Sequence, residues 1–175
     1  MRLVYYIFII VILSQLGILG CSKEQTKTVR QLKIYSADDL NSVINLSRVT
    51  LDSTVYAEGS GSIKIVAKKP MVVKLYETGN LDVENCHIIY QAKLKTAGLQ
   101  GFAYLEMWCH FPGKGEFFSR ALQSKLTGDN DWSSHEASFL LQTGERPDNV
   151  KLNLAVNGTG TVWIDEIKLL KVAIN

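Results

Sequence analysis

Apolar side chains alternate with polar ones through most of this 175-residue chain, and that period of two restricts it to β structure. From about residue 32 onward the alternation comes in short runs, such as Val150, Leu152, Leu154 and Val156. Glycine-rich turn sequences separate the runs, among them 58–61, 112–115, 127–130 and 157–160. Only residues 38–46 fit a short helix. The pattern predicts an all-β fold, an antiparallel β-sandwich or barrel.

The first 20 residues have a different composition, with 15 apolar side chains and a single charge at Arg2. The unbroken apolar run 3–13 is at the short end for crossing a hydrocarbon core of about 30 Å and suits a signal peptide. Residues 18–21, Ile-Leu-Gly-Cys, resemble the lipobox of bacterial lipoproteins, in which the cysteine becomes the acylated first residue. We therefore predict a signal peptide over 1–20 and lipidation at Cys21. An uncleaved N-terminal anchor is the alternative.

A lipid at Cys21 would make the membrane a partner of this protein, because buried acyl chains hold a domain at the bilayer. Residues 21–31 would then form a lipidated start and a polar, flexible tether, and residues 32–175 the folded domain. In enterobacterial lipoproteins an aspartate after the cysteine retains the protein at the inner membrane. Ser22 occupies that position here. The sequence thus predicts a location in the bacterial cell envelope, at the outer membrane.

The charge balance excludes some partners. The chain has 19 basic and 17 acidic residues, and its formal charge is +2. Nucleic-acid binders that rely on a basic footprint need a larger excess, so we expect no nucleic-acid partner. A nearly neutral domain favours a neutral ligand over a polyanion.

The sequence predicts a hairpin formed by residues 86–95 and 102–111 around a turn at 96–101. In this hairpin Lys95 pairs with Phe102 and Ile88 with Cys109. One face of that hairpin collects a core set: Cys86, Ile88, Tyr90, Ala92, Leu94, Ala103, Leu105, Met107, Cys109 and Phe111. The other face mixes aromatic with hydrogen-bonding side chains.

That second face suggests a carbohydrate site, because a sugar ring offers an apolar face to an aromatic ring and hydroxyls to polar groups. The candidate ligand-binding residues are Trp108, Tyr104, Glu106, His110, Gln91 and His87. Asn153 and Asn157 would join them if their strand lies beside this face. The competing interpretation packs the aromatic rings under a loop or a second layer.

Three segments, 59–65, 127–132 and 161–169, resemble in order the "G-x-x-S-L-K-I", "G-T-x-D-W" and "aromatic-aliphatic-D-D-V-x-L" motifs of galactose-binding-like jelly rolls. That group includes many carbohydrate-binding modules of polysaccharide-degrading enzymes. The resemblance implies two antiparallel sheets packed as a sandwich. It also implies a candidate structural calcium at Asp165, which matches an acid of the family's closing strand. The alternative is an aspartate that accepts hydrogen bonds from loop amides.

Cys86 and Cys109 are the two cysteines that remain after lipidation. In the predicted hairpin they lie diagonal to one another on the core face, so a disulfide between them is one interpretation and two buried thiols are the other.

No catalytic motif stands out in the sequence. His87, His110 and Glu106 would form a metal site or an acid–base pair only if the hairpin register were right. We therefore predict a non-catalytic, lipid-anchored binding module for carbohydrate. An envelope protein that uses the same face for a protein partner is the alternative, and a hydrolase is a more distant one.

Overall fold

The computed structural model describes residues 28–174, which fold into strands joined by loops and two short 3-10 turns. The strands are β1 (Val29–Tyr35), β2 (Thr50–Asp52), β3 (Ser62–Ala67), β4 (Met71–Gly79), β5 (Cys86–Phe111), β6 (Gly115–Arg120), β7 (Asn130–Leu141) and β8 (Asn149–Ala173). The 3-10 turns are Leu46–Arg48 and Leu122–Ser124. Every strand pairing is antiparallel, which confirms the predicted all-β class.

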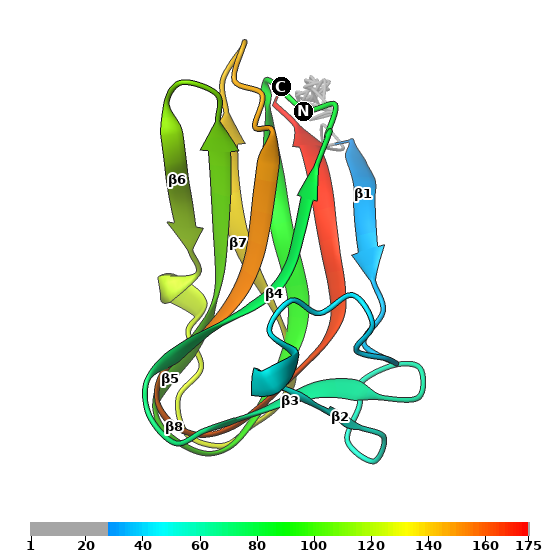
Figure 1. The fold of residues 1–175 in the computed structure, drawn as a ribbon, viewed down its shortest axis with the longest axis vertical. Helices are drawn as coiled ribbons and strands as arrows, with labels where there is room; N and C mark the ends of the chain where they lie inside the picture. Colours follow the sequence, from blue (N-terminus) through cyan, green and yellow to red (C-terminus); the bar gives the residue numbers. More distant parts are fainter. Residues whose placement is uncertain (1–27, 175) are drawn as a thin grey trace, which may run out of the picture.

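Two long strands, β5 and β8, pair along nearly their whole length and bend together in the middle, so that one hydrogen-bonded sheet closes into a sandwich (Figure 1). We call one layer sheet one: β1, β3, residues 160–173 of β8, residues 86–97 of β5, and β7, with β2 beside β3. Sheet two consists of β4, residues 149–159 of β8, residues 100–111 of β5, and β6.

Glycines at the bend allow the two long strands to approach closely. A Cβ atom on Gly158 would lie 1.9 Å from the carbonyl oxygen of Gln100, and one on Gly101 would lie 2.1 Å from the carbonyl oxygen of Asn157. Only glycine fits such an approach. The turns predicted at 96–101 and 157–160 are therefore wrong, because these glycines bend continuous strands instead of ending them.

The core between the two sheets contains the whole face that the sequence assigned to it. All ten residues from Cys86 to Phe111 in that set are buried, and Ile88, Leu94, Leu105 and Met107 are fully so. The alternation thus predicts the buried face correctly on both sides of the bend. The hairpin was wrong, because the two segments belong to one strand and to different sheets.

Of the two interpretations of Cys86 and Cys109, the disulfide is wrong and the pair of buried thiols is right. The two cysteines lie in different sheets, and both are free and buried. Two cysteines can bridge only when their Cβ atoms lie about 3.8 Å apart. Burial raises the pKa of the Cys109 thiol to about 12 and also raises that of Cys86, so both behave as small apolar side chains.

Two other local predictions need correction. Strand β1 begins at Val29, so residues 29–31, assigned to the tether, belong to sheet one. Residues 38–45 form turns rather than a helix, and the 3-10 turn Leu46–Arg48 follows them. The predicted signal peptide and Cys21 lie outside the described residues. Within residues 28–174, no helix is both long and apolar enough to cross a membrane.

Candidate functional site

The outer face of sheet two carries the aromatic residues that the sequence singled out on β5. Strand register places Lys74, Asn153, Glu106 and Arg120 in one row across β4, β8, β5 and β6. The row on one side contains Val72, Ala155 and Tyr104, and the row on the other contains Lys151, Trp108 and Phe118. Tyr104 and Trp108 therefore stand on either side of the central polar row.

Glu106 is the centre of this row and is only 3% exposed. Its carboxylate accepts hydrogen bonds from Trp108 Nε1 at 2.7 Å, from Arg120 Nε at 2.6 Å and from Asn153 Nδ2 at 3.2 Å. Burial would raise the pKa of Glu106, but these three hydrogen bonds outweigh it and lower that pKa. Because its oxygens are buried and already partnered, Glu106 fixes the indole of Trp108 and does not present itself to a ligand.

Trp108 lies on the face as a half-buried ring held from two sides. On one side its indole donates to Glu106, and on the other side lies Phe118. The centroids of the Trp108 and Phe118 rings are 5.0 Å apart, at an interplanar angle of 48°. The guanidinium of Arg120 lies 4.2 Å from the Phe118 ring. Tyr104, also half-buried, stacks against Phe102 at 6.0 Å. The second half of β5 thus forms an aromatic ridge whose rings are oriented by the protein itself.

Two separate hollows flank β8 beside this ridge, and we call the pair the β8 groove. Tyr104 lines the larger hollow, and Lys151, the β8 neighbour of Trp108, lines the smaller one. The larger, of about 310 Å³, is lined by Pro70, Met71, Val72, Tyr104, Ala155, Val156 and Asn157. The smaller, of about 130 Å³, is lined by Ile44, Lys74, Tyr76, Glu77, Lys151 and Asn153. Ala155 and Asn153 are 3% and 5% exposed, respectively, and form the floor. A groove exists here because these floor residues are shorter than their neighbours on β4 and β5.

The floor holds an unused hydrogen-bond acceptor. Asn153 Nδ2 donates to Glu106, which fixes the orientation of the amide, yet Asn153 Oδ1 is buried without a partner. A buried carbonyl oxygen left unpaired costs free energy that a donor arriving with a ligand would recover. Among the floor residues, Asn153 is therefore the one that carries a hydrogen-bond acceptor which the protein itself leaves unused. The alternation of β8 placed it on the polar side, but only the long-range pairing with β5 brings it beside Trp108.

The other predicted ligand residues divide between two faces. His110 is on the outer face of sheet two, at the end of β5, and its Nδ1 lies 2.5 Å from Asp148 Oδ1. His87 and Gln91 are on the outer face of sheet one, where they contact Ser138 Oγ at 3.2 Å and Glu136 Oε1 at 2.5 Å. A six-residue site on one face is thus wrong, because it required the hairpin.

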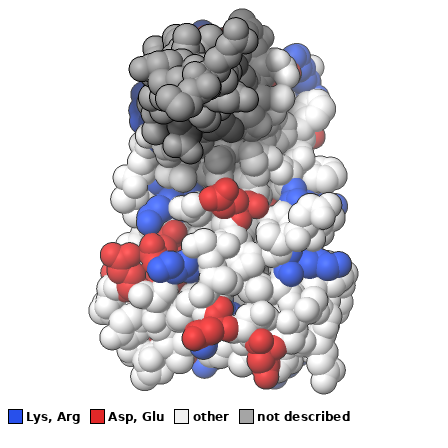
Figure 2. All heavy atoms as spheres, turned by 180° about the vertical axis from the view of Figure 1, so that it is seen from behind, with Lys and Arg blue, Asp and Glu red and all other residues white. Residues whose placement is uncertain are grey.

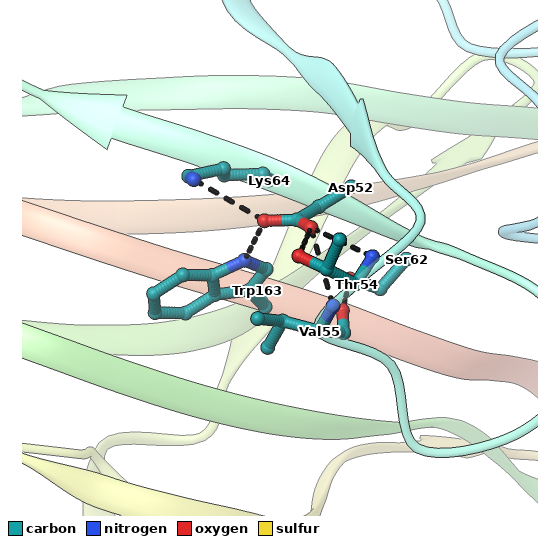
Figure 3. A network of polar contacts seen from close by, with 6 residues as sticks. All are labelled: Asp52, Thr54, Val55, Ser62, Lys64 and Trp163. Carbon is teal, nitrogen blue, oxygen red and sulfur yellow. Dashed lines mark hydrogen bonds and ion pairs between the residues drawn. The ribbon is translucent and has the colours of Figure 1, made fainter.

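Trp163, in the closing strand β8, is on the outer face of sheet one, and Asp52, Val55 and Lys64 lie around its indole (Figure 3). Its Nε1 donates to Asp52 Oδ2 at 2.9 Å, and Lys64 Nζ lies 3.2 Å from the same oxygen. The second oxygen of Asp52 accepts from the amides of Thr54 and Val55. The hydrogen bond from Trp163, followed by those from Thr54, lowers the pKa of Asp52. With 8% exposure, Trp163 cannot offer its ring to a ligand.

Asp165, the candidate calcium ligand, is 4% exposed in the same strand. Its Oδ2 accepts from the amides of Ala57 and Glu58 at 2.8 and 3.1 Å, and its Oδ1 accepts from the Glu166 amide at 2.7 Å. These contacts match the alternative in which loop amides satisfy the carboxylate. Among the described residues, no cluster of three or more His, Cys, Asp or Glu side chains is arranged to hold a metal. Calcium at Asp165 stays a prediction.

Charges are distributed rather than concentrated. On the part of the face in Figure 2 that described residues form, basic and acidic side chains are interspersed. Beside the β8 groove, Lys151 pairs with Glu116 and Arg120 pairs with Glu106. The surroundings of the groove thus contain charged side chains that largely compensate one another.

No protein-family profile matches the chain, and no curated protein matches its sequence. The fold, however, is similar to solved carbohydrate-binding modules. The CBM22-1 xylan-binding domain of Xyn10C from Paenibacillus barcinonensis matches with a TM-score of 0.61 at 10% identity, over 85% of this chain and 99% of that one. The C-terminal family 22 module of Clostridium thermocellum Xyn10B matches with a TM-score of 0.54 at 12% identity, over 82% and 94% of the two chains. At such identities the likeness establishes the β-sandwich fold.

Proposed function

We propose that this protein is a non-catalytic carbohydrate-binding module that holds a sugar chain in the β8 groove, against Trp108 and Tyr104. The observation that carries the proposal is the combination of an oriented indole with a free acceptor at Asn153 Oδ1. A pyranose ring needs an apolar surface for its C–H face and polar partners for its hydroxyls, and this face supplies both. The similarity to xylan-binding modules adds support at the level of the fold.

The ligand class that fits best is a neutral glycan. The charges beside the groove balance, since Lys151 and Arg120 have carboxylate partners and Lys74 lines the same hollow as Glu77. An acidic polymer would have to compete with those carboxylates, whereas a neutral chain leaves the pairs intact. Xylan is the first candidate to test, and other neutral plant and bacterial polysaccharides follow.

The test is calorimetric titration of the chain with a panel of neutral polysaccharides and their oligosaccharides. We expect at least one to bind, and we expect Trp108→Ala to abolish that binding because the stacking surface is lost. Tyr56→Ala is the matched control, since Tyr56 is an exposed aromatic outside the groove. Absence of binding to every glycan, or equal loss in both variants, would refute the proposal. A membrane protein that crosslinks to the Trp108 face would favour the protein-partner alternative.

The proposal places this module on the bacterial cell envelope through a lipid at Cys21, at the outer membrane as Ser22 suggests. What supports it is the sequence: a short apolar run followed by Gly20 and Cys21. Metabolic labelling with a fatty-acid analogue should mark the wild-type chain and not Cys21→Ala. Equal labelling of both would show that Cys21 is not the acylated residue, and membrane fractionation would then show whether the apolar run itself anchors the chain.

A further inference from the structure

An apolar hollow lies at the end of the sandwich, away from the β8 groove. It measures about 330 Å³ and is lined mainly by Phe111, Phe117, Phe139 and Leu140. Phe117 and Leu140 are 47% and 42% exposed, which is unusual for large apolar side chains that neighbour each other. The carbohydrate proposal assigns no role to this end.

The hollow forms where the two sheets part. Phe111 is at the end of β5 in sheet two and Phe139 is near the end of β7 in sheet one, with ring centroids 6.0 Å apart. Phe117, from the edge strand β6, meets Phe111 edge-on at 5.8 Å. Because β6 and β7 are not paired as strands, the space beside these rings opens to the outside.

The described chain begins at this same end. The amide of Ala173 donates to the carbonyl of Thr28 at 3.2 Å, and Ala173 is in register with Cys86, which is in register with Leu141. Thr28, Ala173, Cys86 and Leu141 thus form one row across β1, β8, β5 and β7. Three spacings between neighbouring strands put Thr28 and Leu141 about 14 Å apart. Figure 1 shows the start of β1, the end of β8 and the turn between β5 and β6 at one end of the sandwich.

Few residues separate Cys21, the proposed anchor, from the start of the described chain at Thr28. Cys21 and Thr28 are seven residues apart, so even a fully extended chain spans no more than about 24 Å between them. The straight part of β5, from Cys86 to Thr96, is about 33 Å long at the usual rise per residue. An acylated Cys21 therefore brings the Phe117 end within reach of the bilayer and leaves the glycine bend at the far end.

We propose that this end, through Phe117 and Leu140, docks on the lipid surface, a contact that rests on the lipid anchor proposed above. The two side chains would enter the boundary between headgroups and acyl chains, as apolar side chains of interfacial proteins do. Phe117 is in register with Cys109 and Leu140 with His87, so both side chains point to the sheet-one side of their strands. The β8 groove, on the outer face of sheet two, then faces away from the docked side chains and stays open to a glycan chain.

The charges at the rim indicate which force drives this contact. Lys114 pairs with Glu145, and Arg146 pairs with Glu84. A rim that is neutralised in this way gains little from anionic lipids, so the contact should depend on apolar burial and hold at high salt.

The experiment uses the lipidated full chain in vesicles of phosphatidylethanolamine and phosphatidylcholine that contain acyl-brominated lipid. Phe117→Trp and Leu140→Trp report the docking end, and Val66→Trp is the control, since Val66 is 55% exposed on β3 beside the far bend. After subtraction of the parent signal, we expect quenching of the first two to exceed that of the control at least about 2-fold, because bromine quenches only residues that reach the acyl region.

Equal quenching of all three, on vesicles that retain the acylated protein, would overturn the docking while leaving the anchor in place. Chemical crosslinks between copies through the Phe117 end, without quenching, would overturn it in favour of self-association. A chain that carries no acyl group at Cys21 would overturn the anchor and the docking together, without bearing on glycan binding.

Discussion

Two tryptophans, one on each sheet, show how similar local chemistry leads to different roles. Trp108 and Trp163 each donate their indole hydrogen to a carboxylate, at 2.7 Å from Glu106 and at 2.9 Å from Asp52. Glu106 belongs to the same strand as Trp108 and lies beneath the face, so the ring remains partly exposed. Asp52 is the last residue of β2, and the loop that follows it, with Val55, lies beside Trp163, which is 8% exposed (Figure 3). The position of the acceptor thus decides whether the indole stays partly exposed or is covered.

The largest expected effect is on stability, in Trp163→Ala. The covering loop would lose its packing surface and Asp52 its first hydrogen-bond donor, so we expect the free energy of unfolding to fall by about 3–5 kcal/mol. Chemical denaturation followed by circular dichroism measures it. Trp163→Phe, which keeps most of the ring, should cost only about 1 kcal/mol. A loss below 1 kcal/mol in Trp163→Ala would mean that the loop does not depend on this ring.

Glu106→Gln tests whether the buried carboxylate orients Trp108. The variant keeps the shape but removes the charge that holds Arg120, and we expect glycan affinity to fall about 10-fold and unfolding free energy to drop by about 1–3 kcal/mol. Calorimetric titration and denaturation give the two values. Glu116→Gln, at an exposed pair with Lys151, is the control and should leave the stability nearly unchanged, because exposed ion pairs contribute little. Unchanged affinity in Glu106→Gln would contradict the positioning role.

Asn153→Ala separates binding from folding. The variant loses one hydrogen bond to Glu106 but also removes the unpaired Oδ1, so the free energy of unfolding should change by less than about 1 kcal/mol. Affinity for the glycan should fall about 5- to 10-fold, because the floor can no longer accept a hydroxyl hydrogen. Asn41→Ala, in an exposed loop, should alter neither quantity. Full affinity in Asn153→Ala would remove Asn153 from the site.

The pH dependence of stability tests the two carboxylates that accept the indole hydrogens, Asp52 and Glu106. Folding lowers the pKa of both Asp52 and Glu106, so each contributes stability above its unfolded pKa, near 3.9 and 4.3 respectively. That contribution is lost as pH falls from about 5 toward the lower folded values. Denaturation curves between pH 7 and pH 3 should therefore show falling stability, with a flatter dependence in Asp52→Asn and in Glu106→Gln. An unchanged dependence in both variants would contradict these shifts.

The sequence predicted the core of β5 because alternation depends only on neighbouring residues. Ile88 and Leu105 were assigned to one buried face, although a bend separates them. The sequence predicts turns where the structure has bends, because glycines such as Gly101 and Gly158 occur both where a strand ends in a turn and where a continuous strand bends. Only the close approach of the two backbones distinguishes these cases. A Cβ atom on Gly158 would lie 1.9 Å from the carbonyl oxygen of Gln100.

The candidate site was predictable in part for the same reason. Trp108, Tyr104 and Glu106 follow from one strand's alternation and were placed on a common face. Asn153 became a floor residue only through the pairing of β8 with β5, which a single sequence does not reveal. His87 and Gln91 were misplaced because their position depended on the hairpin.

The most direct test is a nuclear magnetic resonance titration of the isotope-labelled chain with a glycan that binds. The account predicts that the indole signal of Trp108 and the side-chain amide of Asn153 shift together, while the indole of Trp163 stays in place under its loop. A shift of Trp163 with Trp108 unchanged, or no shift at Trp108 with a glycan that binds, would contradict it.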